Sequence, residues 1–154
     1  LMEIFNSNSF HSTLAPFILL IILIACGYSD VKSKKIPNIL TISGILFGII
    51  FNTYLYGYTG LLSSLISIVV VFVLFILPYL LKQFGAGDIK LLIMVASIMN
   101  FYYCIGATIM SSIFCAIYAI INSIRLKSFK FTIPFGLFMC IGTIFYQILI
   151  YIFY

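Results

Sequence analysis

Two aspartates, Asp30 and Asp88, are the residues of this sequence best suited to acid–base chemistry. The third acidic residue is Glu3, and the single histidine, His11, stands in the same polar N-terminal stretch. When two carboxyl groups share a water molecule, repulsion between their charges raises one pKa, and the pair retains one proton near neutral pH. One carboxylate then takes a proton from the water while the other group donates a proton to a substrate carbonyl. This chemistry needs neither a metal nor a nucleophilic side chain.

Both aspartates occur in the same short pattern, Asp30-Val31-Lys32 and Asp88-Ile89-Lys90, at the edges of long apolar runs. Ionisable groups at the edge of the hydrocarbon are costly and usually mark function. Gly85 and Gly87 precede Asp88, and glycines allow backbone conformations that other residues resist and leave space beside the carboxyl group. We therefore expect an extended substrate segment to approach Asp88 closely.

The rest of the chain is apolar enough to require lipid as its solvent. Hydrophobic residues make up 64% and charged residues 7% of the 154 residues, and the mean hydropathy is +1.29. A water-soluble domain of this length does not need so much apolar surface. The sequence therefore predicts an all-α, polytopic membrane protein in which residues 1–154 form a single integral membrane domain.

Six transmembrane helices are predicted, because a spanning helix takes about 20 residues and polar segments separate the apolar runs. The predicted spans are residues 14–29, 39–54, 61–81, 88–101, 105–124 and 132 to the C-terminus. Pro37 suits the first turn of the second span. Residues 56–60 (YGYTG) predict a turn with interfacial aromatic side chains before the third span.

All the basic residues follow the first, third or fifth predicted span and therefore lie at one membrane face. They are Lys32, Lys34, Lys35, Lys82, Lys90, Arg125, Lys127 and Lys130. The positive-inside rule makes this face cytoplasmic, and six spans then place both termini outside. Asp30 at the end of the first span and Asp88 at the start of the fourth are then at the same depth, near the inner surface.

Simpler roles are open for the same charged residues. Asp88 suits the N-cap of the fourth helix, and Asp30 suits a solvated loop in which it balances the nearby lysines. Lys32 and Lys90 suit orientation of the chain and contact with the phosphates of anionic lipids. These interpretations involve no catalysis.

Other features predict packing. Gly44 and Gly48 have the small-xxx-small spacing of helix interfaces in membranes. The cysteines fall inside apolar runs without a CxxC pair, which predicts small apolar side chains and no disulfide framework; they are Cys26, Cys104, Cys115 and Cys140. Since His11 has no partner either, we expect no metal site.

Three segments resemble, in order, the signatures of the type IV prepilin peptidase family. Asp30-Val31-Lys32 followed by Ile36-Pro37-Asn38 is similar to the first signature. Gly85-Ala86-Gly87-Asp88-Ile89-Lys90-Leu91 resembles the GxGD motif, which the family shares with preflagellin peptidases and, more remotely, presenilins. Ile133-Pro134-Phe135-Gly136, at the start of the last span, is similar to a third family segment.

The resemblance implies a GxGD intramembrane aspartic protease-like fold with Asp30 and Asp88 as the catalytic residues. It assigns the neighbouring motif residues to the substrate cleft: Gly85, Gly87, Lys90, Pro37, Asn38, Pro134, Phe135 and Gly136. The implied substrates are prepilin, pseudopilin or flagellin-like precursors, whose short basic leaders are removed at the inner face of a prokaryotic plasma membrane. No cofactor is implied, and the expected partners are precursors and anionic lipids, without nucleic acid.

The sequence departs from the larger bacterial members of that family. Those members carry a cytoplasmic insert with paired CxxC motifs and also methylate the new N-terminus. Residues 30–38 are too few for this insert, and the chain has no CxxC. We therefore expect the compact form of the enzyme, without a zinc insert and without N-methyltransferase activity.

Two other functions are compatible with these charges. A small proton-coupled transporter could use Asp30 and Asp88 as a relay, but it predicts acidic residues nearer the middle of the bilayer and internal repeats. A non-catalytic assembly subunit would tolerate Asp88→Asn. The peptidase hypothesis has its own tension, because a basic rim repels a basic leader unless anionic head groups attract both.

Overall fold

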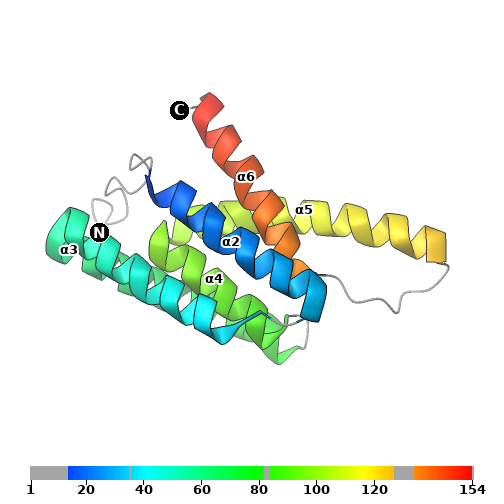
Figure 1. The fold of residues 1–154 in the computed structure, drawn as a ribbon, viewed down its shortest axis with the longest axis horizontal. Coiled ribbons are helices and arrows are strands. Elements are labelled where there is room, and N and C mark those ends of the chain that lie inside the picture. Colours follow the sequence, from blue (N-terminus) through cyan, green and yellow to red (C-terminus); the bar gives the residue numbers. More distant parts are fainter. Residues whose placement is uncertain (1–13, 35, 82–83, 127–133, 154) are drawn as a thin grey trace.

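The computed structural model describes residues 14–34, 36–81, 84–126 and 134–153. The regular secondary structure in these ranges is α-helical (Figure 1). The helices are α2 (Leu14–Ser33), α3 (Asn38–Leu80), α4 (Ala86–Ile98), α5 (Phe101–Leu126) and α6 (Phe135–Phe153). Predictions about residues 1–13, Lys35, Lys82, Lys127, Lys130 and residues 131–133 lie outside the described ranges.

Helix α3 is a hairpin, because Gly57 reverses the chain within it. Gly57 has φ 60° and ψ −137°, a conformation open to glycine but rarely adopted by residues with a Cβ. Asn52 Nδ2 donates a hydrogen bond of 2.9 Å to Ser64 Oγ, although a straight helix would separate these residues by about 18 Å. Two antiparallel arms result (Figure 1), and the turn predicted at residues 56–60 coincides with the reversal.

Four of the described helices, α2, α3, α5 and α6, are long and apolar enough to cross a membrane. Helix α4 corresponds to the fourth predicted span, but it has 13 residues. Its length of about 20 Å is less than the hydrocarbon thickness of about 30 Å. The count of six spans therefore stays a prediction, with the hairpin supplying two of the predicted spans within α3.

The chain turns from α4 into α5 earlier than the sequence predicts. Helix α5 begins at Phe101, whereas the predicted fifth span begins at residue 105. The cause is Asn100, whose Oδ1 accepts a 2.8 Å hydrogen bond from the N–H of Tyr103. Asparagine is among the best N-caps, because its side chain satisfies an N–H group that the helix leaves unpaired.

Helix α4 forms the buried centre of the bundle and packs mainly against α3, while α6 packs against α2 and α5. Several of its side chains have an exposed fraction of 0%: Leu91, Leu92, Met94, Val95, Ala96 and Ile98. Lipid tails are as apolar as these side chains, so close contact and hydrogen bonds hold such helices together.

The face of α3 that meets α4 is made of small residues one turn apart. Gly44 and Gly48 are buried there. A Cβ added at Gly44 would lie 2.5 Å from Met94 Sδ, and one added at Gly48 would lie 2.8 Å from the backbone nitrogen of Ile98. The interpretation of these glycines as a helix-packing pattern is confirmed.

Replacing Gly48 by alanine is expected to lower the free energy of unfolding by about 1–3 kcal/mol. The new Cβ would meet the α4 backbone, which cannot move aside as a flexible side chain can. Thermal unfolding in detergent would compare it with Leu46→Ala, a change at a side chain of the same arm that is 56% exposed. Equal unfolding temperatures for Gly48→Ala and the wild type would contradict this packing.

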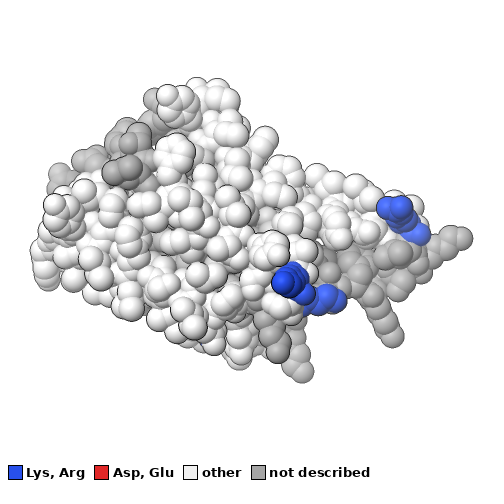
Figure 2. Space-filling view, viewed as in Figure 1, with Lys and Arg blue, Asp and Glu red and all other residues white. Residues whose placement is uncertain are grey.

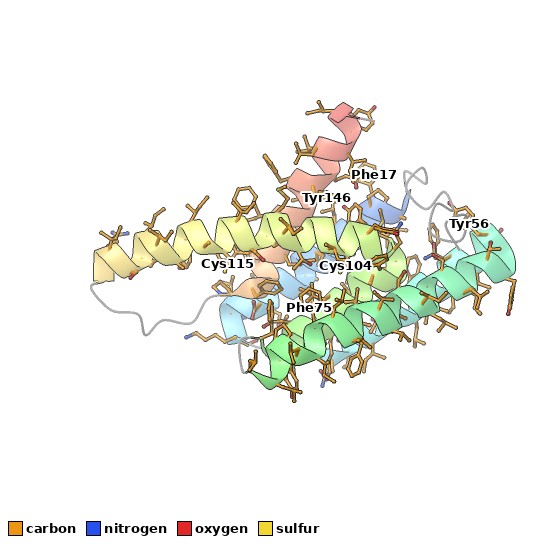
Figure 3. The ribbon with its side chains drawn as sticks, turned by 180° about the vertical axis from the view of Figure 1, so that it is seen from behind. Phe17, Tyr56, Phe75, Cys104, Cys115 and Tyr146 are labelled. Atoms are coloured by element: carbon orange, nitrogen blue, oxygen red, sulfur yellow. The ribbon has the colours of Figure 1, made fainter. Side chains whose placement is uncertain are left out.

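The four cysteines are free thiols: Cys26 and Cys104 are buried, and Cys115 and Cys140 are half-buried. Figure 3 shows Cys104 among the other helices and Cys115 farther along α5, whose far end extends away from the bundle. Cys104 Sγ lies 3.3 Å from the carbonyl oxygen of Leu92 on α4. These thiols pack within and between helices, as the sequence predicts.

Basic side chains gather at one end of the molecule. Lys32 lies in the last turn of α2, and Arg125 in the last turn of α5. Among the described residues, the basic side chains that Figure 2 shows on this face lie towards that end. The N-termini of α3, α4 and α6 meet the C-terminus of α2 in the same region (Figure 1).

Candidate active site

The ends of α2, α3, α4 and α6 enclose, beside α5, a cavity of about 720 Å³. Its lining residues are Asp30, Val31, Lys34, Ile36, Asn38, Gly85, Ala86, Gly87, Asp88, Lys90, Tyr118, Pro134 and Phe135. Asp30 and Asp88 come from different helices, and the fold places both on the wall of this one cavity.

Asp30 lies in the last turn of α2 and is buried, with an exposed fraction of 8%. Its Oδ2 accepts a 2.8 Å hydrogen bond from the N–H of Gly136, at the start of α6. The first N–H groups of a helix have no partner within it, so Asp30 caps α6 from another helix. Just beyond, Lys34 adopts φ 51°, and its N–H bonds the carbonyl of Asp30 at 2.8 Å, which ends α2 in a left-handed cap.

Asp88 lies in the first turn of α4. Its Oδ2 accepts a 2.9 Å hydrogen bond from the N–H of Gly85. Gly85 occupies the N-cap position and Asp88 is the third helical residue, so the interpretation of Asp88 as the N-cap itself is wrong. It does complete the cap, as an acidic residue at the third position often does.

The carboxyl group of Asp88 responds to its surroundings, Asp30 included. Asp88 lies outside the four helices that are long enough to span a membrane. Burial raises the pKa of its carboxyl group above the usual range, the N–H of Gly85 lowers it, and the charge of Asp30 raises it. The carboxyl group of Asp88 therefore holds its proton more tightly than that of an ordinary aspartate.

The glycines of the GxGD segment leave space for neighbouring groups, and their backbone conformations are ordinary. Gly85 has φ −78°, and among the described glycines only Gly57 has a positive φ. The expectation of an unusual backbone at Gly85 and Gly87 is therefore wrong. A Cβ added at Gly85 would lie 3.2 Å from Asp88 Oδ2, and one at Gly87 would lie 3.4 Å from the Cβ of Ile36. The missing side chain thus gives room to the carboxyl group at Gly85.

Motif residues from two segments meet across the cavity. Lys90 Nζ donates a 2.9 Å hydrogen bond to Asn38 Oδ1, which links the first turn of α3 to α4. Pro37 precedes α3 as its N-cap residue, with φ −64°, one position before its predicted place. Lys90 thus has a partner inside the protein in addition to any role at the lipid surface.

The third motif segment forms another wall of the cavity. Pro134 and Phe135 line it, and the ring of Phe135 meets that of Phe84 edge-on, with centroids 5.2 Å apart. Tyr118 of α5 also lines the cavity and packs against Phe138, with ring centroids 5.1 Å apart. Tyr118 and Phe84 belong to no motif, so the sequence carries no signal that would have singled them out.

Comparison with known proteins identifies the family. Residues 17–120 match the model of the Type IV leader peptidase family. This range contains both aspartates and the GxGD segment, whereas residues 134–136 lie beyond it. No curated protein and no solved structure matched significantly. Because the match covers more than half of the chain, this protein belongs to the type IV leader peptidase family.

Proposed function

We propose that the protein is an intramembrane aspartic endopeptidase that removes the short basic leader from prepilin-like precursors at the cytoplasmic face of the membrane. Membership of the family implies a leader peptidase, and precursors of this kind in general. The observation that carries the aspartic mechanism is that Asp30 and Asp88 line one cavity. In this proposal, the residues that line the cavity beside them form the substrate cleft.

The two carboxyl groups would divide the reaction between them. Asp30, charged, accepts a proton as the water oxygen bonds to the scissile carbonyl carbon, and Asp88 gives its proton to the carbonyl oxygen. In the second half, Asp88 takes that proton back as the carbonyl re-forms, the C–N bond breaks, and Asp30 passes its proton to the leaving amine. The raised pKa of Asp88 supports its role as the acid.

The same proposal places the cavity at the inner face of a plasma membrane crossed several times. The described basic residues support this, because Lys32, Lys34 and Lys90 lie around or beside the cavity and Arg125 ends α5. A basic rim favours the cytoplasmic side and attracts anionic lipids. Those lipids would offset the repulsion between the rim and a basic leader.

We propose further that residues 1–154 act as one peptidase domain without N-methyltransferase activity. Helix α2 ends at Ser33 and α3 begins at Asn38, which leaves no length for a folded insert between them. The chain also lacks a CxxC pair.

The test is coexpression in membranes with candidate precursors from the same genome, read by gel and by mass spectrometry. We expect a shortened product whose new N-terminus is an unmethylated amine, and no product from Asp88→Asn. Cleavage that survives Asp88→Asn would exclude the paired-carboxylate mechanism. A methylated product from the purified protein would exclude the peptidase-only form. Precursors that stay intact with the wild type would favour a proton-coupled transporter or a non-catalytic assembly subunit.

A further inference from the structure

We propose that the N-terminus of α6 is part of the active site and that Gly136 is the positioning residue for Asp30. The inference rests on the proposed function, since it concerns the same pair of carboxyl groups. Gly136 acts in two ways: its N–H holds one carboxylate oxygen, and its missing side chain makes room for that carboxylate.

The hydrogen bond itself is the first support. The distance from Gly136 N to Asp30 Oδ2 is 2.8 Å in a buried setting, within the range of charge-assisted bonds. A buried charge is costly unless it is paired or hydrogen-bonded. In the part of the chain that the structure describes, the N–H of Gly136 is the group that donates a hydrogen bond to the Asp30 carboxylate. The positive end of the α6 dipole also favours a negative charge here. Oδ1 is left available to a water molecule in the cavity.

The space at Gly136 is the second support. A Cβ added there would lie 3.1 Å from Asp30 Oδ2 and 3.2 Å from Asp30 Cβ. Rotation of the Asp30 side chain about χ1 would relieve the contact with Oδ2. It would leave the contact with Cβ unchanged, because this rotation does not move Cβ. Any larger residue therefore separates the backbones of α2 and α6 and moves Asp30 relative to the N–H group.

The crossing of α2 and α6 makes this placement rigid. One turn before Asp30, a Cβ added at Gly27 would lie 3.3 Å from Leu137 Cα and 3.4 Å from the carbonyl oxygen of Gly136. The two helices thus meet through their backbones at glycines. The position of Asp30 against the start of α6 is set by main-chain contact, which varies less than contact between long side chains.

The kinetic test compares Gly136→Ala with Gly44→Ala, which crowds the α3–α4 contact against the flexible Met94 side chain and leaves the crossing of α2 and α6 as it is. We expect Gly136→Ala to lower kcat about 10-fold, because the added Cβ displaces Asp30 by a few tenths of an ångström and a misplacement of about 1 Å costs about 100-fold. KM should change little, because substrate binding is not disturbed. Gly44→Ala should stay within a few-fold of the wild type. Equal losses of kcat in the two variants, or wild-type kcat in Gly136→Ala, would overturn the assignment.

A second measurement does not depend on cleavage. The chain has two aspartates, so labelling with carbon-13 aspartate in the Asp88→Asn variant leaves Asp30 as the one labelled carboxyl group. Replacing Gly136 by glycolic acid in cell-free synthesis exchanges its backbone N–H for an ester oxygen. The change removes the donor and adds no side chain. We expect the infrared carboxylate bands of Asp30 in nanodiscs to shift on this change and to stay in place in Gly44→Ala. Unshifted bands would overturn the inference, whereas shifted bands together with a wild type that cuts no precursor would refute the proposed function alone.

Discussion

Replacing Asp30 by asparagine is expected to lower the cleavage rate about 10³-fold while the protein stays folded. Asparagine has the same shape, and its Oδ1 can still accept the N–H of Gly136, which now bonds Asp30 at 2.8 Å. What is lost is the charge that takes a proton from the water. Asp88→Asn should have a similar effect, because an amide cannot supply the proton of a carboxylic acid.

The double variant Asp30→Asn/Asp88→Asn should be no slower than either single variant, since groups that act as a unit are not additive. Initial rates in proteoliposomes measure this, with thermal unfolding to show that each variant is folded. Lys32→Gln is the matched control, because this exposed residue of the same helix end does not line the cavity and should keep its activity. Rate losses that multiply in the double variant would show that the two carboxyl groups do not share one water.

The second large effect is expected on stability, at Asn52, far from the cavity. Its Nδ2 donates to Ser64 Oγ at 2.9 Å and to the carbonyl oxygens of Ser97 at 2.9 Å and Ile98 at 3.1 Å. One amide group thus joins both arms of α3 and satisfies the last carbonyls of α4, which have no partner within their own helix.

Asn52→Asp is therefore expected to lower the free energy of unfolding by about 3 kcal/mol or more. The change replaces the donor by a carboxyl oxygen and sets it against the carbonyl oxygens of Ser97 and Ile98 in a buried site. Unfolding in mixed detergent micelles would measure it against Thr53→Val, which removes a hydroxyl bonded only to Ile49 O in the same arm at 2.6 Å. Equal stability of the two variants would contradict the role of Asn52 as the link between α3 and α4.

The sequence predicted the helical class and the two aspartates because both depend on strong local signals. Long apolar runs require helices, and charges among them are rare. The reversal at Gly57 was also readable, since residues 56–60 combine glycine with interfacial tyrosines. The burial and short length of α4 were not readable, because hydropathy is the same for a helix in lipid and for one enclosed by other helices.

The partners of the aspartates could not be predicted for a different reason. Asp30 and Asp88 both bond backbone N–H groups, of Gly136 and Gly85, and a backbone group leaves no mark in the sequence. The motif at residues 134–136 indicated the neighbourhood of the cleft, but the contact depends on how α2 crosses α6. The purpose of Gly85 was misread for a related reason, since sequence cannot separate a need for space from a need for an unusual φ.

Each aspartate also completes the end of a helix, Asp30 for α6 and Asp88 for α4. Loss of the reaction during evolution would therefore not release these positions from selection. A descendant that no longer cuts precursors but still assembles in the membrane would be expected to keep an oxygen acceptor at both positions, such as asparagine. An aspartate or asparagine at these two positions in a relative is thus not sufficient to infer peptidase activity, whereas an alanine at either would indicate a rebuilt helix end.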